Sequence, residues 1–181
     1  MEREHPPGNE ASFNLIKNIT TLKMMAKKFY LNELLGNRKR ILVTGGAGFI
    51  GGAVIRKLLK ASTSNIFNID KIGYASDLTS IDEIIRTKDY SDRYNFAKVD
   101  LSNSDETAKA ISDSDPDLIM HLAAESHVDR SIQGPETFIN SNIIGTFNLL
   151  EATRKHYENL SNKRKNDFRF LHISTDEVFG S

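Results

Sequence analysis

Residues 40–55, RILVTGGAGFIGGAVI, combine a short apolar run, a glycine-rich turn and the start of a helical pattern. Gly45, Gly48 and Gly51 follow the spacing G-x-x-G-x-x-G between the predicted strand and the predicted helix. In such a turn the first glycine permits a tight bend, the second lets the backbone approach a pyrophosphate, and the third lets helix and strand pack closely. The N–H groups at the helix start then face the phosphates. Glycines also occur in ordinary strand–helix turns, so the surrounding sequence has to show whether this turn binds a dinucleotide.

An acid at the end of the next apolar run supplies that context. Asp70 closes residues 65–70, NIFNID, 19 residues after Gly51, where a carboxylate hydrogen-bonds an adenosine ribose and repels the 2′-phosphate of NADP. By itself Asp70 could equally be a turn cap, and Lys71 could instead attract a phosphate. The glycines, the strand and the acid together predict a dinucleotide site that prefers NAD. Asp100 ends the third apolar run and is expected to reach the adenine amino group, although a loop cap fits it equally.

Strand and helix patterns alternate along the chain after residue 40. Five apolar runs, at 40–44, 65–70, 94–100, 116–124 and 168–174, alternate with helical spacing at 53–61, 105–112 and 135–157, and residues 158–168 are expected to form a polar basic loop. This alternation indicates βαβ units. The predicted fold is therefore α/β, a doubly wound parallel sheet of the Rossmann type.

The first 39 residues form a separate pattern, and we expect a helical N-terminal extension (1–39) before the NAD-binding domain (40–181). Apolar residues recur every three or four positions between Ser12, a predicted N-cap, and Gly36, a predicted stop. A basic helix on a membrane surface or on a partner is one interpretation. We favour a helix packed on the domain, or a mis-chosen start codon, because the polar face is not uniformly basic.

Composition excludes several classes of protein. Lys+Arg and Asp+Glu both number 24, so no net charge favours a nucleic-acid partner. The chain has no cysteine, which rules out disulfides, thiolate chemistry and Cys-ligated zinc. No apolar run reaches the roughly 18 residues of a membrane span. The first residues lack the pattern of a secretory signal, so a cytoplasmic location is expected.

Three motifs resemble those of a known family. TGGAGFIG (44–51) resembles the extended short-chain dehydrogenase/reductase superfamily, while HLAAESHVDRSI (121–132) and STDEVFG (174–180) are similar to the dTDP-glucose 4,6-dehydratase family. The resemblance runs from about residue 40 to the last residue. Related epimerases and decarboxylases tend to have a small residue or a single acid where this chain has Asp176 and Glu177.

The resemblance implies a reaction on dTDP-glucose. Bound NAD oxidises the sugar C4 hydroxyl, water is lost across C5–C6, and the hydride returns to C6, giving dTDP-4-keto-6-deoxyglucose. Elimination needs a base and an acid beside one hexose. By resemblance Glu177 is the base, Asp176 the acid, and Thr175 hydrogen-bonds the hydroxyl that is oxidised. Adjacent carboxyl groups in an apolar site raise one pKa, which would keep Asp176 protonated. Without the other motifs, STDE would fit a helix N-cap with acids in the first turn.

The resemblance also implies which residues contact the ligands. The cofactor-binding residues are expected to be Gly45, Gly48, Phe49, Ile50, Gly51, Asp70, Lys71, Ile72, Gly73, Asp100, Leu101, Leu122, Ala123, Ala124, Glu125, Ser126 and Ser141. Ser126, Asn142 and Thr175 are expected to contact the substrate. His121 and His127 are spaced i, i+6 across a strand and a loop, which does not make a metal site, and no metal is predicted.

The family's oxidation step uses a Tyr-x-x-x-Lys pair on the helix after the fifth strand. This sequence ends before that point, and its one formal match, residues 94–98 (YNFAK), falls in a predicted strand and is treated as a coincidence. We therefore expect an N-terminal portion that is inactive alone, with an uncovered sheet edge and exposed apolar surface. A homodimer or a complementing C-terminal chain is the expected partner. The alternatives are another NAD-dependent nucleotide-sugar epimerase or decarboxylase, or a non-catalytic or partner-dependent NAD-binding protein.

Overall fold

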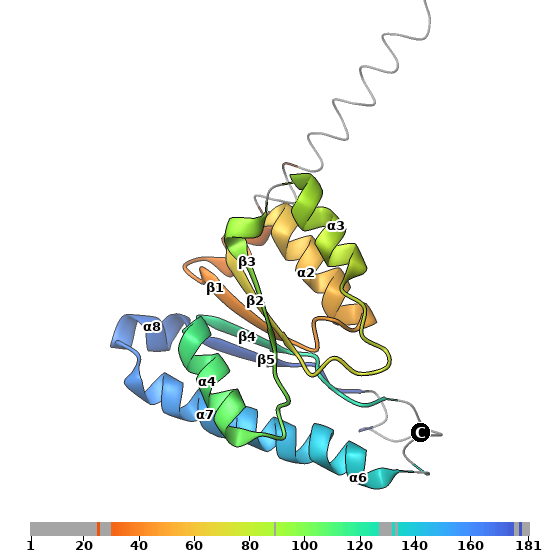
Figure 1. Ribbon diagram of the computed structural model, residues 1–181. Helices are drawn as coiled ribbons and strands as arrows, with labels where there is room; N and C mark the ends of the chain where they lie inside the picture. The colour runs from red at the N-terminus through yellow and green to blue at the C-terminus, as the bar shows by residue number, and fades with distance from the viewer. Residues whose placement is uncertain are drawn as a thin grey trace, which may run out of the picture.

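The computed structural model describes residues 25, 30–88, 90–126, 132, 134–175 and 178. Five strands form one parallel sheet in the order β3-β2-β1-β4-β5 (Figure 1). Their bounds are β1 Arg40–Thr44, β2 Asn65–Asp70, β3 Tyr94–Lys98, β4 Leu118–His121 and β5 Arg169–His172. The predicted five-stranded, doubly wound sheet is confirmed, although the last three strands are shorter than the apolar runs that predicted them.

The strand order reverses at β1. β1 pairs with β2 on one side, where Thr44 lies opposite Ile69, and with β4 on the other, where Thr44 lies opposite His121. The carboxyl ends of these three strands therefore meet at one edge of the sheet. Ligands of open parallel α/β sheets bind at such a reversal point.

Helices cover both faces of the sheet. α2 (Phe49–Ala61) and α3 (Thr79–Lys88) lie on one face, and α4 (Ser104–Ser114) and α7 (Gly145–Asn159) on the other (Figure 1). The predicted helix over 135–157 is built as α6 (Pro135–Phe138), a π-helical segment η2 (Ile139–Ile144), and α7. The short 3-10 helix η1 (Ser91–Arg93) precedes β3.

Two helices were not predicted from the sequence. One is α3, at whose start the Asp77 carboxylate accepts a hydrogen bond from the Thr79 amide (2.8 Å). The prediction of a basic loop over 158–168 was wrong, because α8 (Asn162–Asp167) forms within it. Ser161 caps α8, and Arg164 within this helix is held by two acids on a neighbouring turn.

An ion-pair network at the amino-terminal edge of the sheet accounts for α8. Asp115 and Asp117, between α4 and β4, each pair with both Arg40 at the start of β1 and Arg164 of α8. Burial pushes the pKa of Asp117 upward, but hydrogen bonds from Arg40 and the charges of both arginines outweigh it, so this pKa lies below its ordinary value. One basic residue of the stretch 158–168, Arg164, therefore makes a structural contact, which a count of charges does not predict.

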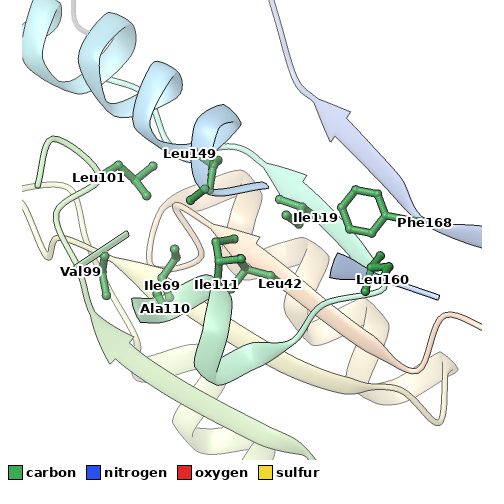
Figure 2. Close-up of a cluster of buried hydrophobic side chains, with 11 residues drawn as sticks. Leu42, Ile69, Val99, Leu101, Ala110, Ile111, Ile119, Leu149, Leu160 and Phe168 are labelled. Atoms are coloured by element: carbon green, nitrogen blue, oxygen red, sulfur yellow. The ribbon is translucent and has the colours of Figure 1, made fainter. Parts of the chain in front are cut away.

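Alternate residues of β1 enter two different cores. Ile41 and Val43 pack with Ile55 of α2 and Ile81 of α3. Leu42 packs on the opposite face in a cluster that includes Ile111 of α4, Ile119 of β4 and Leu149 of α7 (Figure 2). All three β1 side chains are fully buried. A strand buried on both faces is typical of a parallel sheet covered by helices on each side.

The described end of the N-terminal helical pattern packs on the domain. Residues 30–35 are helical, and Leu35 is buried against the α2 face of the sheet. Gly36 ends this helix with a φ of +53°, and its amide donates to the carbonyls of Asn32 and Glu33, which confirms the predicted stop. The predicted cap Ser12 lies outside the described residues, and the division at residue 39 stays a prediction.

Apolar side chains remain exposed on β5, η2 and α7. Leu171 of β5 and Ile173 after it are each 43% exposed. Within η2 and α7, a stripe at helical spacing is also exposed: Ile139, Ile143, Phe147 and Leu150. These exposures agree with the predicted apolar surface. Among the described helices, none is long and apolar enough to cross a membrane.

Adjacent leucines of α7 provide a matched test of this packing. Leu149 is fully buried in the cluster of Figure 2, whereas Leu150 is 47% exposed. We expect Leu149→Ala to lower the free energy of unfolding by about 2–5 kcal/mol because it leaves a cavity in the core. Leu150→Ala should cost less than about 1 kcal/mol. Urea unfolding of both variants measures the difference, and equal losses would contradict the assigned faces of α7.

Candidate cofactor site

A cavity of about 440 Å³ opens at the carboxyl ends of β1, β2 and β4. Its walls come from the glycine loop after β1, the end of β2 with the loop that follows, the segment after β3, the segment after β4, and Ser141 of η2. The cavity therefore lies where the strand order reverses. This is the position that the glycine motif predicted for a dinucleotide.

The predicted cofactor residues converge on this cavity. All of them line it except Ile72, which lines a neighbouring hollow together with Lys71, Gly73, Lys98, Asp100 and Glu106. They come from five separate segments of the chain, so their convergence is a consequence of the fold. Contact with a cofactor itself stays a prediction.

The cavity has five further lining residues that the sequence analysis missed: Ile69, Tyr74, Ala75, Ser76 and Val99. Ile69 and Val99 immediately precede the two acids that were predicted, so the ends of the apolar runs carried a signal for them. Tyr74, Ala75 and Ser76 belong to a loop without a motif, and no pattern in the sequence indicates how that loop folds back.

Two glycines of the loop are required by geometry. Gly45 has a φ of +71°, and a Cβ there would lie 2.7 Å from the backbone of Ala123. A Cβ on Gly51 would lie 2.1 Å from the carbonyl oxygen of Gly45. Distances this short are impossible for real side chains, so the backbone of Gly45 lies directly against the start of α2 on one side and the segment after β4 on the other. The tight turn and the close helix packing predicted for these two glycines are both confirmed.

The first turn of α2 is suited to an anion. Gly48 is its N-cap, no side chain caps the helix there, and the first turn contains no acidic residue. The backbone N–H groups of a helix start carry a partial positive charge that favours phosphate. This end of α2 lies at the cavity, because Phe49, Ile50 and Gly51 all line it.

Asp70 acts as a turn cap and still lines the cavity. One carboxylate oxygen accepts a hydrogen bond from the Ala47 amide (3.0 Å), and the other accepts from the Ile72 amide (2.8 Å) and the Ser76 hydroxyl (3.1 Å). A carboxylate has about four acceptor positions, so one remains for a ligand hydroxyl. The two interpretations of Asp70 in the sequence are therefore compatible.

Asp100, like Asp70, both caps a turn and lines the cavity. It accepts hydrogen bonds from the Ser102 amide (2.9 Å) and hydroxyl (2.8 Å), as a loop cap does, and it lines the cavity as well.

Asn142 is held against the segment after β4. Its side-chain oxygen accepts from the Glu125 amide (2.8 Å), and its side-chain nitrogen donates to the Glu125 carbonyl (2.9 Å). Both polar ends of Asn142 thus fix the backbone of Glu125. The substrate contact of Asn142 stays a prediction, and the contact that the structure shows is with the backbone of Glu125.

An ion pair joins two walls of the cavity. The Lys71 ammonium, after β2, lies 2.6 Å from a carboxylate oxygen of Glu125, after β4. Since β1 lies between these strands in the sheet, the pair connects segments on either side of the glycine loop. A phosphate contact of Lys71 stays a prediction, and the contact that its ammonium makes in the structure is with Glu125.

A buried histidine at the end of β4 bridges two threonine hydroxyls below the cavity, one from β1 and one from α7. His121 at the end of β4 is 1% exposed, with Nδ1 2.7 Å from the Thr44 hydroxyl and Nε2 3.0 Å from the Thr146 hydroxyl. The Thr44 hydroxyl also accepts a hydrogen bond from the Ala123 amide (3.2 Å). Burial, together with the nearby charge of His172, lowers the pKa of His121 to about 4.

Metal binding finds no support in the part of the chain that the structure describes, where no group of three potential ligands occurs. His127 lies outside that part.

The formal Tyr-x-x-x-Lys match lies along β3, the strand at one end of the sheet, as predicted. There the Tyr94 hydroxyl accepts a hydrogen bond from the side-chain nitrogen of Asn68 (2.9 Å).

The predicted catalytic residues are only partly described. Thr175 is described and exposed, whereas Asp176 and Glu177 lie outside the described residues. β5 is paired with β4, and the Ile173 amide continues the ladder by donating to the His121 carbonyl (3.0 Å). The chain therefore leaves β5 at the same edge of the sheet as the segment that carries Glu125 and Ser126.

Comparisons with known proteins agree with this geometry. Residues 42–181 match the family model described as GDP-mannose 4,6 dehydratase. The chain is 52% identical over 141 residues to a dTDP-glucose 4,6-dehydratase of Salmonella typhimurium, a match that covers 78% of this chain and 38% of that protein. The chain thus spans less than two fifths of the length of this relative.

Solved structures show the same fold. A dTDP-glucose 4,6-dehydratase from Streptomyces venezuelae, with NAD and TYD bound, matches with a TM-score of 0.64 and 34% identity over 78% of this chain and 41% of its own. A UDP-Glc/GlcNAc 4-epimerase from Campylobacter jejuni matches with a TM-score of 0.64 and 27% identity over 77% of this chain and 38% of its own.

The buried His121 predicts a specific dependence of stability on pH. Its pKa is about 4 in the folded chain and about 6.5 when unfolded, so between these values the unfolded chain binds more protons. This stabilisation is complete above about pH 6.5 and is lost as the pH falls toward 4, by about 3 kcal/mol. Urea unfolding from pH 7 to 4 should show this fall, and His121→Gln should remove that part of it. Parallel pH curves for the two proteins would contradict the assignment.

Proposed function

The chain belongs to the GDP-mannose 4,6 dehydratase family, whose model matches residues 42–181, and from this we propose that it forms the cofactor-binding part of a nucleotide-sugar 4,6-dehydratase. Its proposed substrate is dTDP-glucose, the substrate named for its 52% identical relative. The observation that carries the proposal is the cavity at the reversal point of the sheet, where the glycine loop, Asp70 and the segment after β4 meet.

The residues around the cavity fit NAD. The start of α2 suits the pyrophosphate, and the remaining acceptor position of Asp70 suits a ribose hydroxyl. Asp100 is assigned to the adenine, and Leu122 to Ser126 to the nicotinamide side. Bound NAD supplies a hydride acceptor that becomes a donor later in the same reaction. The S. venezuelae relative has NAD bound, which supports this choice of cofactor.

The acid–base chemistry is assigned to the residues after β5. Glu177 removes the proton from C5, and Asp176 donates a proton to the C6 hydroxyl as it leaves. The products are the C5–C6 double bond and one molecule of water. Glu177 gains the proton that C5 loses and Asp176 gives up one proton, so the number of protons on the two carboxyl groups is unchanged. Thr175 orients the C4 hydroxyl by a hydrogen bond. These three roles rest on the matching motif.

Oxidation at C4 also needs a base for the C4 hydroxyl proton. The formal match Tyr94–Lys98 lies in β3, apart from the end of β4 where the nicotinamide is assigned. We therefore assign this step to residues beyond those that the structure describes, in the same polypeptide, a homodimer or a complementing chain. Since the chain spans 38% of the Salmonella relative, the whole reaction is proposed for the complete protein.

A second candidate is a nucleotide-sugar 4-epimerase, because the C. jejuni enzyme matches the fold with the same TM-score of 0.64 as the S. venezuelae dehydratase. Sequence identity favours the dehydratase, at 34% against 27% for these two structures. The product distinguishes the two candidates, because a dehydratase releases water and an epimerase does not. A non-catalytic NAD-binding protein would bind NAD and leave the sugar unchanged.

Adjacent glycines of α2 test the cofactor assignment. A Cβ on Gly51 would lie 2.1 Å from the Gly45 carbonyl oxygen, whereas a Cβ on Gly52 would meet first the terminal Nη1 of the Arg56 side chain at 3.2 Å. We expect Gly51→Ala to weaken NAD binding at least tenfold because the loop must shift, and Gly52→Ala to change it less than about threefold. Isothermal titration of NAD into each variant measures this. Equal effects would contradict a pyrophosphate at this loop.

Glu177→Gln tests the acid–base assignment. In the chain completed with the C-terminal region of the Salmonella relative, this variant should lose water from dTDP-glucose at least about 100-fold more slowly, because an amide cannot act as the base. Mass spectrometry of the product measures the loss, and NAD affinity should stay unchanged. Glu151→Gln, on the exposed face of α7, is the matched control. Elimination by Glu177→Gln at the original rate would refute the role of Glu177.

A further inference from the structure

Charge around the cavity is unevenly distributed. Among the described lining residues, four are charged: Asp70, Lys71, Asp100 and Glu125. Three of these are acids, so Lys71 is the one cation that lines the cavity within the described part of the chain. A dinucleotide carries a negative charge on each phosphate, and NADP adds a further phosphate group. The position of the Lys71 ammonium therefore affects which dinucleotide the cavity can accept.

Glu125 already binds that ammonium. Their charged atoms lie 2.6 Å apart, and the side chains are only 32% (Lys71) and 14% (Glu125) exposed. A partly buried pair of this kind is less screened than a surface pair and holds its partner more firmly. The Asn142 side chain bonds both the amide and the carbonyl of Glu125, so the backbone that carries this acid is held in place beside Lys71.

Asp70 next to Lys71 strengthens the discrimination. Three protein donors hold its carboxylate in place, and the remaining acceptor position suits a hydroxyl donor. A 2′-phosphate at that position would meet the negative charge of Asp70 without a cation to balance it. NADP sites of this fold place a cation near the ribose for that purpose. Lys71 is next to Asp70 in the chain but is neutralised by Glu125.

We propose that Glu125 is a specificity-determining residue, which makes the cavity select NAD over NADP by pairing with Lys71. Asn142 is the positioning residue that keeps Glu125 in reach. The selection thus depends on an acid after β4, on the other side of β1 from Asp70. This inference rests on the proposed function, since it assumes that the cavity binds a nicotinamide dinucleotide.

The test is a comparison of NAD and NADP binding to the 181-residue chain. Glu125→Gln keeps the size of the side chain and removes its charge, which releases the Lys71 ammonium. We expect the ratio of the NADP Kd to the NAD Kd to fall by about tenfold, because an ammonium several ångströms from a phosphate in a partly solvated site contributes on that order. The change in this ratio should become smaller as salt is added, because salt screens the attraction between the ammonium and the phosphate.

Two further variants isolate the cause. Lys71→Gln combined with Glu125→Gln should return the ratio to within about threefold of the original, because the released cation is then absent. Glu158→Gln removes one negative charge from the exposed face of α7 and should leave the ratio unchanged. Should Glu125→Gln fail to fold by circular dichroism, Glu125→Asp keeps the charge, retracts it from Lys71, and should lower the ratio by a smaller factor.

The outcomes separate this inference from the proposed function. If the unaltered chain binds neither NAD nor NADP, the cofactor assignment itself is wrong. If the chain binds NAD but Glu125→Gln leaves the ratio unchanged, the specificity role of Glu125 is overturned. Equal weakening of both dinucleotides would also overturn it, because the pair would then act only as a strap across the cavity.

Discussion

The close approach of three backbone segments at the end of β1 is the constraint on which the site depends. Gly45 turns with a positive φ against the backbone of Ala123, and Gly51 packs on the carbonyl of Gly45. Because no side chain fits at either contact, β1, α2 and the segment after β4 are fixed relative to one another. The cavity is the space that remains above this contact, and the uncapped start of α2 faces it.

The polar groups around the cavity first stabilise the protein itself. Asp70 and Asp100 cap the turns that follow their strands, and Asn142 holds the backbone of Glu125. Such bonds position each group before a ligand arrives, which reduces the entropy lost on binding. In the proposed function, one acid at a strand end therefore serves both folding and recognition.

The sequence predicted the sheet, its five strands and most of the residues that line the cavity, because alternating patterns and glycine spacing are local signals. Features that depend on contacts between distant segments were missed. α8 forms because Arg164 meets Asp115 and Asp117. The pairing of Lys71 with Glu125 is of the same kind, since they lie 54 positions apart in the chain. The loop carrying Ser76 was missed for another reason, because no motif in it indicates that it folds back onto Asp70. The catalytic roles proposed for Asp176 and Glu177 rest on the sequence motif STDEVFG, because both residues lie outside the described part of the chain.

The central claim is that NAD binds with its pyrophosphate at the start of α2 and its nicotinamide beside the segment after β4. Amide NMR spectra of the chain with and without NAD test this most directly. The claim predicts that the largest shifts fall on the amides of Gly48 to Gly51 and of Ala123 to Ser126. NAD binding that leaves both sets of amides unchanged, or no binding of NAD at all, would contradict it.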